Sequence, residues 1–308
     1  VCNYSLTYTV CGQVNHMSPD NHFQDLKRII SAATGKAKRI NVVMPFLYEG
    51  RQHKRTKRES LDCSLALQEL ADMGVSNIIT FDAHDPRVQN AVPLSGFDSF
   101  MPTYQFLKAI IDTVPDFRID NDHLMIISPD EGAMSRAVYF ANILGVDMGM
   151  FYKRRDYSVI VNGKNPIVAH EFLGDDVEGK DVIIVDDMIS SGESMLDVAK
   201  NLKERKANRV LACTTFGLFT DGFDKFDEYY EKGYIDKVVT TNLTYRSPEL
   251  FTKPYYAEAD MSRFLAMIID CLNHDVTLSS IETPTENINE LLSSFRTQKA
   301  RTQESSAL

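Results

Sequence analysis

The sequence predicts an α/β protein of two domains, because strand-like runs alternate with helical stretches along most of its 308 residues. That rhythm is typical of βαβ units built on a parallel sheet. The run Val182-Ile183-Ile184-Val185 is apolar at every position, as expected for a strand that is buried on both faces of such a sheet. A chain of this length suits two domains of ordinary size, each with its own core.

The predicted elements follow one another in regular order. Apolar runs bounded by polar residues predict strands over 39–45, 77–81, 123–128, 148–152, 182–185 and 209–214. Apolar residues at helical spacing predict helices over 60–73, 104–114, 132–144 and 195–205. Residues 157–171 contain Asn162-Gly163 and predict a β-ribbon turn or a mobile loop.

The turn-rich segment 93–102 carries Gly, Ser and two Pro between periodic stretches, and it predicts the domain boundary. We therefore expect an amino-terminal α/β domain over 1–100, a second domain over 101–275 and a carboxyl-terminal tail over 276–308. The tail is rich in Ser, Thr and Glu, and we expect its end, 297–308, to be poorly ordered.

Composition excludes several classes of protein. The apolar fraction of 44% and the charged fraction of 25% are those of a soluble globular protein, and no apolar run is long enough for a membrane span. The net charge of −10 argues against nucleic acid or an anionic membrane as a partner. Five widely spaced cysteines without a CxxC motif indicate neither a disulfide framework nor a zinc site, and we expect a reducing cytoplasm. The start at Val1 has neither an initiator Met nor a signal-peptide pattern, and we expect it to be a cut inside a larger protein.

Two adjacent acids, Asp186 and Asp187, follow the buried strand and precede a Ser/Gly-rich turn. They fall at the carboxyl end of a parallel strand, where α/β sheets bind ligands. The turn Ser190-Ser191-Gly192 leads into a helix, and backbone N–H groups at a helix N-terminus stabilise a phosphate. Carboxylates there could hold ribose hydroxyls or a hydrated Mg²⁺. The motif predicts a site for a phosphorylated sugar; the alternative is that the acids are turn and capping residues.

A basic loop and a histidine follow two earlier strands. Residues 50–58 put five fixed positive charges into eight residues, which suits a polyphosphate, although most basic runs are solvated loops. His84 follows the strand that ends at Phe81; it could ligate a metal or donate to a phosphate, with Asp82 fixing its tautomer. A lone histidine in this position is more often structural.

Two later strand ends carry compatible chemistry. Asp130 lies between a strand and a helix, where it could bind Mg²⁺ or act as a helix N-cap. The basic triplet Lys153-Arg154-Arg155 precedes the suspected loop, where it could neutralise charge on a transferred phosphoryl group or be a surface patch.

The ordered series of motifs resembles the ribose-phosphate diphosphokinase, or PRPP synthetase, family over roughly residues 8–275. The matching motifs are Met44 to Gln52, Asp82-Ala83-His84, Ser128-Pro129-Asp130, Lys153 with Arg155, and Val185 to Met188 with the following loop. The resemblance implies an α/β fold with two phosphoribosyltransferase-like domains, each with a largely parallel sheet flanked by helices. It also implies transfer of the diphosphoryl group of ATP to ribose 5-phosphate, which gives PRPP and AMP for nucleotide biosynthesis.

The resemblance assigns roles to individual residues. It implies ATP binding by Arg51, Gln52, Lys54, Arg55 and His84; metal binding, with Mg²⁺ as the cofactor, by His84 and Asp130; ribose 5-phosphate binding by Asp186, Asp187, Ser190, Ser191, Gly192, Glu193 and Ser194; and catalysis by Lys153, Arg155 and His84. A site shared between subunits in the family implies at least a homodimer.

Some positions depart from the family pattern. Ser190 stands where many members have Asp, and Glu193 stands where Gly is usual. His53 replaces an acid, and Tyr48-Glu49 replaces a Gly-Tyr pair. In the family, about fifty residues precede the segment that matches 6–15. A catalytically inactive regulatory homologue and a phosphoribosyltransferase that consumes PRPP remain alternative functions.

Overall fold

The computed structural model describes residues 7–155, 167–279 and 285–306, which divide into two compact units. Unit 1 contains the described residues up to Pro102, with Asn242–Arg246 and Ser262–Leu278. Unit 2 contains Thr103–Thr241, Ser247–Met261 and the described residues from Ser279 onward. Both units are α/β, as predicted. Two segments from late in the chain belong with unit 1, although the sequence analysis expected one uninterrupted domain over 101–275.

Unit 2 is built on a seven-stranded sheet with the order β12-β11-β10-β9-β6-β7-β8. All neighbours are parallel except β7 and β8, which form an antiparallel ribbon. The residues that would turn this ribbon, 156–166, lie outside the described residues. The strands are β6 (Leu124–Ser128), β7 (Met148–Arg155), β8 (Ile167–Leu173), β9 (Asp181–Ile189), β10 (Val210–Gly217), β11 (Lys237–Thr241) and β12 (Tyr256–Ala259).

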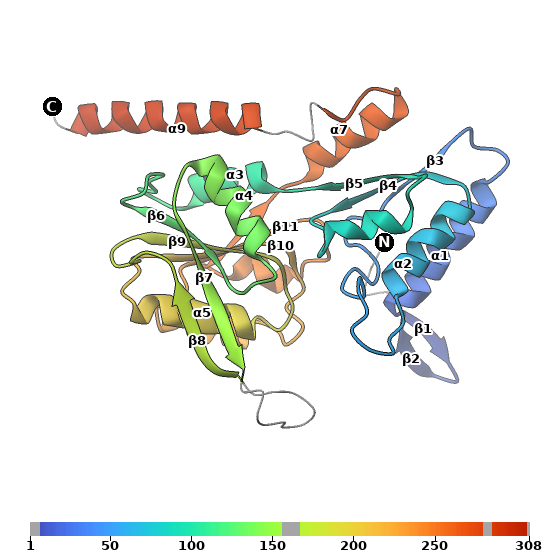
Figure 1. Ribbon diagram of the computed structural model, residues 1–308, viewed down its shortest axis with the longest axis horizontal. Helices are drawn as coiled ribbons and strands as arrows, with labels where there is room; N and C mark the ends of the chain where they lie inside the picture. Colours follow the sequence, from blue (N-terminus) through green and yellow to red (C-terminus); the bar gives the residue numbers. More distant parts are fainter. Residues whose placement is uncertain (1–6, 156–166, 280–284, 307–308) are drawn as a thin grey trace. The chain divides into compact units, whose positions relative to one another are not determined.

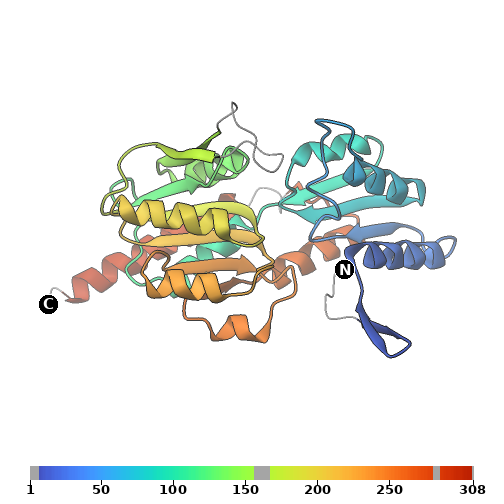
Figure 2. The same ribbon diagram turned by 90° about the horizontal axis from the view of Figure 1, so that it is seen from below.

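Helices cover both faces of this sheet because its central strands are apolar on both sides. One face packs against α3 (Thr103–Thr113) and α4 (Met134–Leu144), and the other packs against α5 (Glu193–Glu204), α6 (Asp224–Glu231) and the 3₁₀ helix η2 (Pro248–Thr252). Figure 1 shows α3 and α4 above the strands and α5 below them, and Figure 2 shows α5 lying across the sheet.

A helix that the sequence analysis missed, α9 (Thr285–Ser306), occupies most of the expected tail. Ile288 and Leu292 are buried in the core that contains α3, and Leu291 and Phe295 pack against it. This spacing is that of one helix face, so the polar composition of the tail concealed an amphipathic helix. None of the helices in the described ranges is both long and apolar enough to cross a membrane.

Unit 1 contains a three-stranded parallel sheet in the order β3-β4-β5. Its strands are β3 (Ile40–Val43), β4 (Val75–Phe81) and β5 (Gly96–Phe100). One face packs against α1 (Pro19–Ala33), α2 (Asp62–Asp72) and the 3₁₀ helix η1 (Pro86–Ala91). On β4 and β5, Phe81 and Phe100 contact Phe264 of α7 (Ser262–Asn273) edge to face. A hairpin of β1 (Thr7–Val10) and β2 (Gln13–His16) precedes α1.

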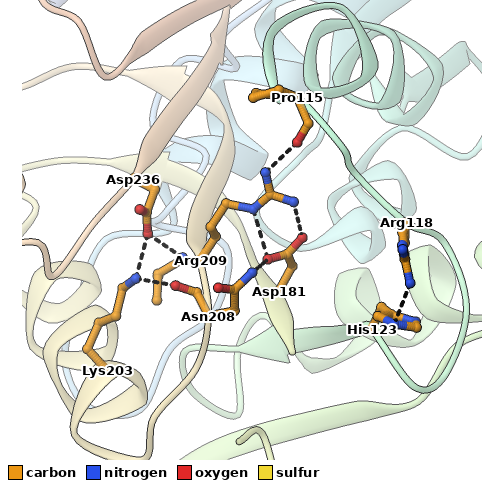
Figure 3. Close-up of polar contacts among 9 residues, drawn as sticks. Pro115, Arg118, His123, Asp181, Lys203, Asn208, Arg209 and Asp236 are labelled. Carbon is orange, nitrogen blue, oxygen red and sulfur yellow. Dashed lines mark hydrogen bonds and ion pairs between the residues drawn. The ribbon is translucent and has the colours of Figure 1, made fainter. Parts of the chain in front are cut away.

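A charged network ties together the amino-terminal ends of β9, β10 and β11 (Figure 3). Arg209 donates to both carboxylate oxygens of Asp181, at 2.9 and 2.5 Å, and to the carbonyl of Pro115. Asp236 accepts from the N–H of Val210 at 2.7 Å and pairs with Lys203. These contacts tie the strands together at their amino-terminal ends, which lie opposite the edge where the sequence predicts a site.

Candidate functional site

The acids Asp186 and Asp187 lie in the last four residues of β9, which continues through Ile189 rather than ending near Val185 as predicted. The Asp187 side chain is buried, and the N–H of Asp187 donates to Oδ1 of Asp186 at 2.8 Å. The acids therefore belong to the rigid carboxyl-terminal edge of the sheet. A ligand held by them is positioned by the core of unit 2.

The electrostatics of this edge favour a cation or several hydroxyl donors. Burial raises the pKa of Asp186, and the neighbouring charges of Asp187 and Asp130 raise it further. Asp130 follows β6, which is the direct neighbour of β9, and its carboxylate accepts from the N–H groups of Gly132 and Ala133. The charge of Asp130 is near enough to Asp186 to affect its pKa. Asp130 is not the N-cap that the sequence left as an alternative, because Ala133 holds that position in α4; the contacts of Asp130 belong to the turn before the helix.

The predicted phosphate loop runs from Ser190 to the start of α5. Gly192 has φ = +84°, a left-handed conformation that glycine adopts without strain, and a Cβ built on it would come within 2.4 Å of the Phe226 ring. The N–H groups of the first helical turn have no acceptor within the helix, so they can bind an anion. Both the turn and the close packing against α6 therefore require glycine at this position.

The unusual Glu193 occupies the first turn of α5, and its side chain lies 3.6 Å from the Nζ of Lys225 on α6. Both side chains are exposed, at 70% and 50%. The ion pair gives the carboxylate a cationic partner on α6, and the first turn of a helix is a favourable position for an acid.

Lys153 and Arg155 lie within β7, which extends three residues beyond its predicted end. Their backbones pair with those of His170 and Ile167 in β8. β7 lies next to β6, and the last residues that pair between these two strands are Ser128 of β6 and Met150 of β7. Both residues therefore lie beyond the carboxyl end of β6, and their side chains lie outside the described part of the chain.

In unit 1, the basic loop after β3 is anchored by Tyr48. Its ring stacks on Phe23 of α1 at 4.3 Å, and its hydroxyl donates to Asp20 at 2.7 Å. Burial, with Asp20 nearby, raises the pKa of Tyr48, so the hydroxyl stays protonated. The next residue, Glu49, has φ = +52° and starts the turn that is closed by the N–H of Gln52.

Beyond this turn, the predicted ATP-binding residues are exposed, whereas His53 points inward. The exposed residues are Arg51, Gln52, Lys54 and Arg55. The His53 side chain is only 10% exposed, and its ring centre lies 5.3 Å from that of His84. Burial lowers the pKa of His53, whereas Arg87 holds the pKa of the adjacent Asp85 carboxyl well below its usual range.

Several residues that shape these loops escaped the sequence analysis. They are Asp20, Phe23, Asp85, Lys225 and Phe226. Most contact their partners across 25 to 34 positions of sequence, so no local pattern could have revealed them. Among the local signals, only the departures from the family pattern at Tyr48, His53 and Glu193 indicated side chains that needed partners elsewhere in the chain.

Two family models match the chain. Residues 105–258 match the phosphoribosyl transferase domain, and residues 7–74 match the N-terminal domain of ribose phosphate pyrophosphokinase. The matched ranges contain every residue that the sequence analysis assigned to a site except His84.

The chain is also similar over most of its length to individual proteins. It is 31% identical over 255 residues to a ribose-phosphate pyrophosphokinase from Thermosipho africanus, covering 81% of this chain and 75% of the relative. It is 28% identical over 265 residues to one from Shewanella oneidensis, covering 85% and 79%. The crystal structure of phosphoribosylpyrophosphate synthetase from Mycobacterium smegmatis has a TM-score of 0.69 at 20% identity, covering 88% of this chain and 90% of that one. This likeness confirms the predicted fold of two phosphoribosyltransferase-like domains.

Proposed function

Because this chain belongs to the ribose-phosphate pyrophosphokinase family, we propose that it transfers the diphosphoryl group of ATP to the anomeric hydroxyl of ribose 5-phosphate. The hydroxyl oxygen forms a bond to the β-phosphorus, the bond from that phosphorus to the oxygen shared with the α-phosphate breaks, and the hydroxyl loses its proton. The products are PRPP and AMP. The proposal rests on the combination of two features in one chain. Unit 2 has an acidic pair and a proposed phosphate loop at one edge of its sheet, and unit 1 has a basic loop at the end of a strand.

Unit 2 supplies the site for the acceptor. Asp186 and Asp187 would hold the ribose hydroxyls, and the loop from Ser190 through Ser191, Gly192, Glu193 and Ser194 would bind the 5-phosphate at the N-terminus of α5. Charged hydrogen-bond acceptors fixed in a strand hold a sugar in one orientation. Correct orientation of a nucleophile can lower a barrier by several kcal/mol, roughly 7 to 11 in ideal cases.

Unit 1 supplies the residues for the donor. Arg51, Gln52, Lys54 and Arg55 are exposed on a loop that Tyr48 fixes to α1, and they would orient the ATP phosphates. His84 would contact the triphosphate or its metal ion from the end of β4.

The acids of unit 2 would supply part of the coordination of a magnesium ion. Burial raises the pKa of Asp186, and the charges of Asp187 and Asp130 are near enough to raise it further; hard cations prefer carboxylate oxygens as ligands. Asp130 would hold Mg²⁺ there, and His84 would hold the ion that accompanies ATP. A bound Mg²⁺ screens the repulsion between the two phosphorylated substrates.

Lys153 and Arg155 would stabilise the charge on the diphosphoryl group during transfer. In phosphoryl transfer, positioning and electrostatic stabilisation supply most of the catalysis. The backbone of β7 places both residues beyond the end of β6, the strand that Asp130 follows. We assign both residues as charge stabilisers.

We further propose a cytoplasmic homo-oligomer whose partners are ATP and ribose 5-phosphate. The absence of a CxxC motif supports a reducing compartment, and so does the lack of a disulfide among the four described cysteines, two of which are buried.

An AMP-release assay tests the proposed function. The chain, and a form extended at its amino end, are supplied with ATP, Mg²⁺ and ribose 5-phosphate, and AMP and PRPP are measured together. We expect equal amounts of both products, and no AMP when ribose 5-phosphate is omitted. Binding of ribose 5-phosphate without AMP from either form would indicate an inactive homologue. Conversion of PRPP and a nucleobase to a nucleotide would indicate a phosphoribosyltransferase.

A further inference from the structure

Two consecutive residues of α6 pack against the proposed phosphate loop. The Phe226 ring lies where a side chain on Gly192 would be, and the Nζ of Lys225 lies 3.6 Å from a carboxylate oxygen of Glu193. Gly192 is the N-cap of α5, and Glu193 is the first residue of that helix. The start of α6 therefore places a cation beside the helix terminus at which the 5-phosphate would bind.

The segment that leads from β10 to α6 is joined to the same loop by its backbone. The N–H of Leu218 donates to the carbonyl of Ile189 at 2.8 Å, and the N–H of Thr220 donates to the carbonyl of Ser190 at 3.0 Å. Because these bonds tie the segment to the end of β9, the fold itself holds Lys225 near the loop, and the ion pair with Glu193 is not needed to bring it there.

Lys225 is the one fixed cation that these two segments provide. Residues 181–199 contain neither Lys nor Arg, and residues 210–231 contain Lys225 alone. Both segments are otherwise rich in acids, including Asp224 directly before the lysine. A phosphate bound to the loop would therefore meet a single cation from these segments, and that cation is the partner of Glu193.

Glu193 and a bound phosphate would compete for the same end of α5. An acid in the first turn interacts favourably with the positive end of the helix dipole, which also attracts a phosphate. The two negative groups would repel each other, and the ammonium of Lys225 would offset that repulsion by bringing the charge of the pair to zero. Both side chains of the pair are exposed, so the pair contributes little to the stability of the fold.

We propose that Lys225 is a positioning residue of the acceptor site, which holds and neutralises the Glu193 carboxylate so that the loop accepts a phosphate despite an acid in its first turn. This role rests on the proposed function, because the phosphate is that of ribose 5-phosphate. Glu193 stands where the family pattern has Gly, and the resemblance to the family assigns no role to Lys225. The pair is thus a feature of this chain, in which a cation on α6 compensates for an acid on α5.

Calorimetry of ribose 5-phosphate binding to the full chain, without ATP, tests the pair. Lys225→Met should weaken binding by about tenfold at low salt, because an unpaired carboxylate then lies near a phosphate dianion. Glu193→Gln should bind at least as tightly as the wild type. Adding Lys225→Met to Glu193→Gln should cost no more than about threefold, since the carboxylate that the lysine neutralises is already gone.

Salt dependence separates a charge effect from a change in the shape of the loop. The loss in Lys225→Met should shrink when NaCl rises from about 0.02 M to about 0.5 M, because salt screens exposed charges. Lys232→Met is the matched control. Lys232 directly follows α6 and pairs with Glu228, both side chains being 54% exposed, and its variant should bind as the wild type does.

Two results would overturn the role of Lys225. Unchanged affinity in Lys225→Met would mean that Glu193 needs no partner. An equal loss with and without Glu193→Gln would mean that the lysine acts on the phosphate itself or only shapes α6. Binding is measured without turnover, so both results stay valid if the AMP-release assay finds no product. A wild type that does not bind ribose 5-phosphate would overturn the acceptor site and the role of Lys225 together.

Discussion

The N–H of Asp187 donates to a carboxylate oxygen of Asp186 at 2.8 Å, so the two acids occupy one short stretch at the end of β9. Burial and the charge of Asp187 raise the pKa of Asp186. An acid whose pKa is higher in the folded than in the unfolded protein lowers stability as pH rises through the interval between the two values. At neutral pH the ligand-free protein is therefore less stable than it would be without this acid, because Asp186 ionises less readily in the folded than in the unfolded protein.

Asp186→Asn should stabilise the ligand-free protein at neutral pH. The variant should gain a few degrees in Tm at pH 7, and the gain should shrink toward zero near pH 4, the ordinary pKa of an aspartic acid. Thermal unfolding from pH 4 to 8 without divalent ions measures it. Ribose 5-phosphate should raise the Tm of the wild type and have much less effect on the variant. A gain that is the same at every pH would contradict the electrostatic explanation.

Gly192→Ala should weaken ribose 5-phosphate binding by at least about tenfold. The new Cβ would meet both the left-handed backbone and the ring of Phe226 at 2.4 Å, so the phosphate loop would have to move. Gly179→Ala is the matched control, because Gly179 has φ = +76° but no atom near its Cβ. It should cost only about 1 to 2 kcal/mol of stability, with binding unchanged. Equal binding by both variants would exclude the loop as the phosphate site.

Much of the fold could be predicted because its signals are local. The strands β6, β9 and β10 each contain a run of four apolar residues, and the predicted acids come soon after the runs of β6 and β9. The missed strand β5 is short and contains Gly96 and Asp98 within a turn-rich segment, so its pairing with β4 decided its structure. The neighbours of His53 and Gly192 depend on tertiary contacts, which no local pattern contains.

Tyr48→Phe should raise the KM for ATP a few fold and leave the KM for ribose 5-phosphate unchanged. The change removes the hydrogen bond to Asp20 but keeps the stack on Phe23, at a cost of about 1 kcal/mol. Steady-state kinetics with each substrate varied in turn measures it. Tyr8→Phe, at an exposed position of β1, is the control. An unchanged KM for ATP would mean that the basic loop is held without this anchor.

Arg209→Leu should destabilise unit 2 by about 3 kcal/mol, because it leaves the buried Asp181 carboxylate without a cation. The Asp181 side chain is only 5% exposed. Lys206→Ala breaks an ion pair with Glu178 whose side chains are 71% and 56% exposed, and it should cost much less stability than Arg209→Leu, because exposed ion pairs contribute little. Urea unfolding measures both. KM values should not change, since the network lies at the edge of the sheet opposite the proposed ligand site. Equal stability losses in the two variants would contradict the role of burial.

Lys153→Ala should abolish turnover, with kcat falling by at least about 10²-fold, while ribose 5-phosphate affinity stays within a few fold. A charge that acts only on the diphosphoryl group in transit contributes to the transition state and not to acceptor binding. Single-turnover AMP release and calorimetry with ribose 5-phosphate separate the two effects. Lys200→Ala, on the solvent side of α5, is the control for loss of a lysine from unit 2. A large loss of sugar-phosphate binding in Lys153→Ala would instead place this lysine in the acceptor site.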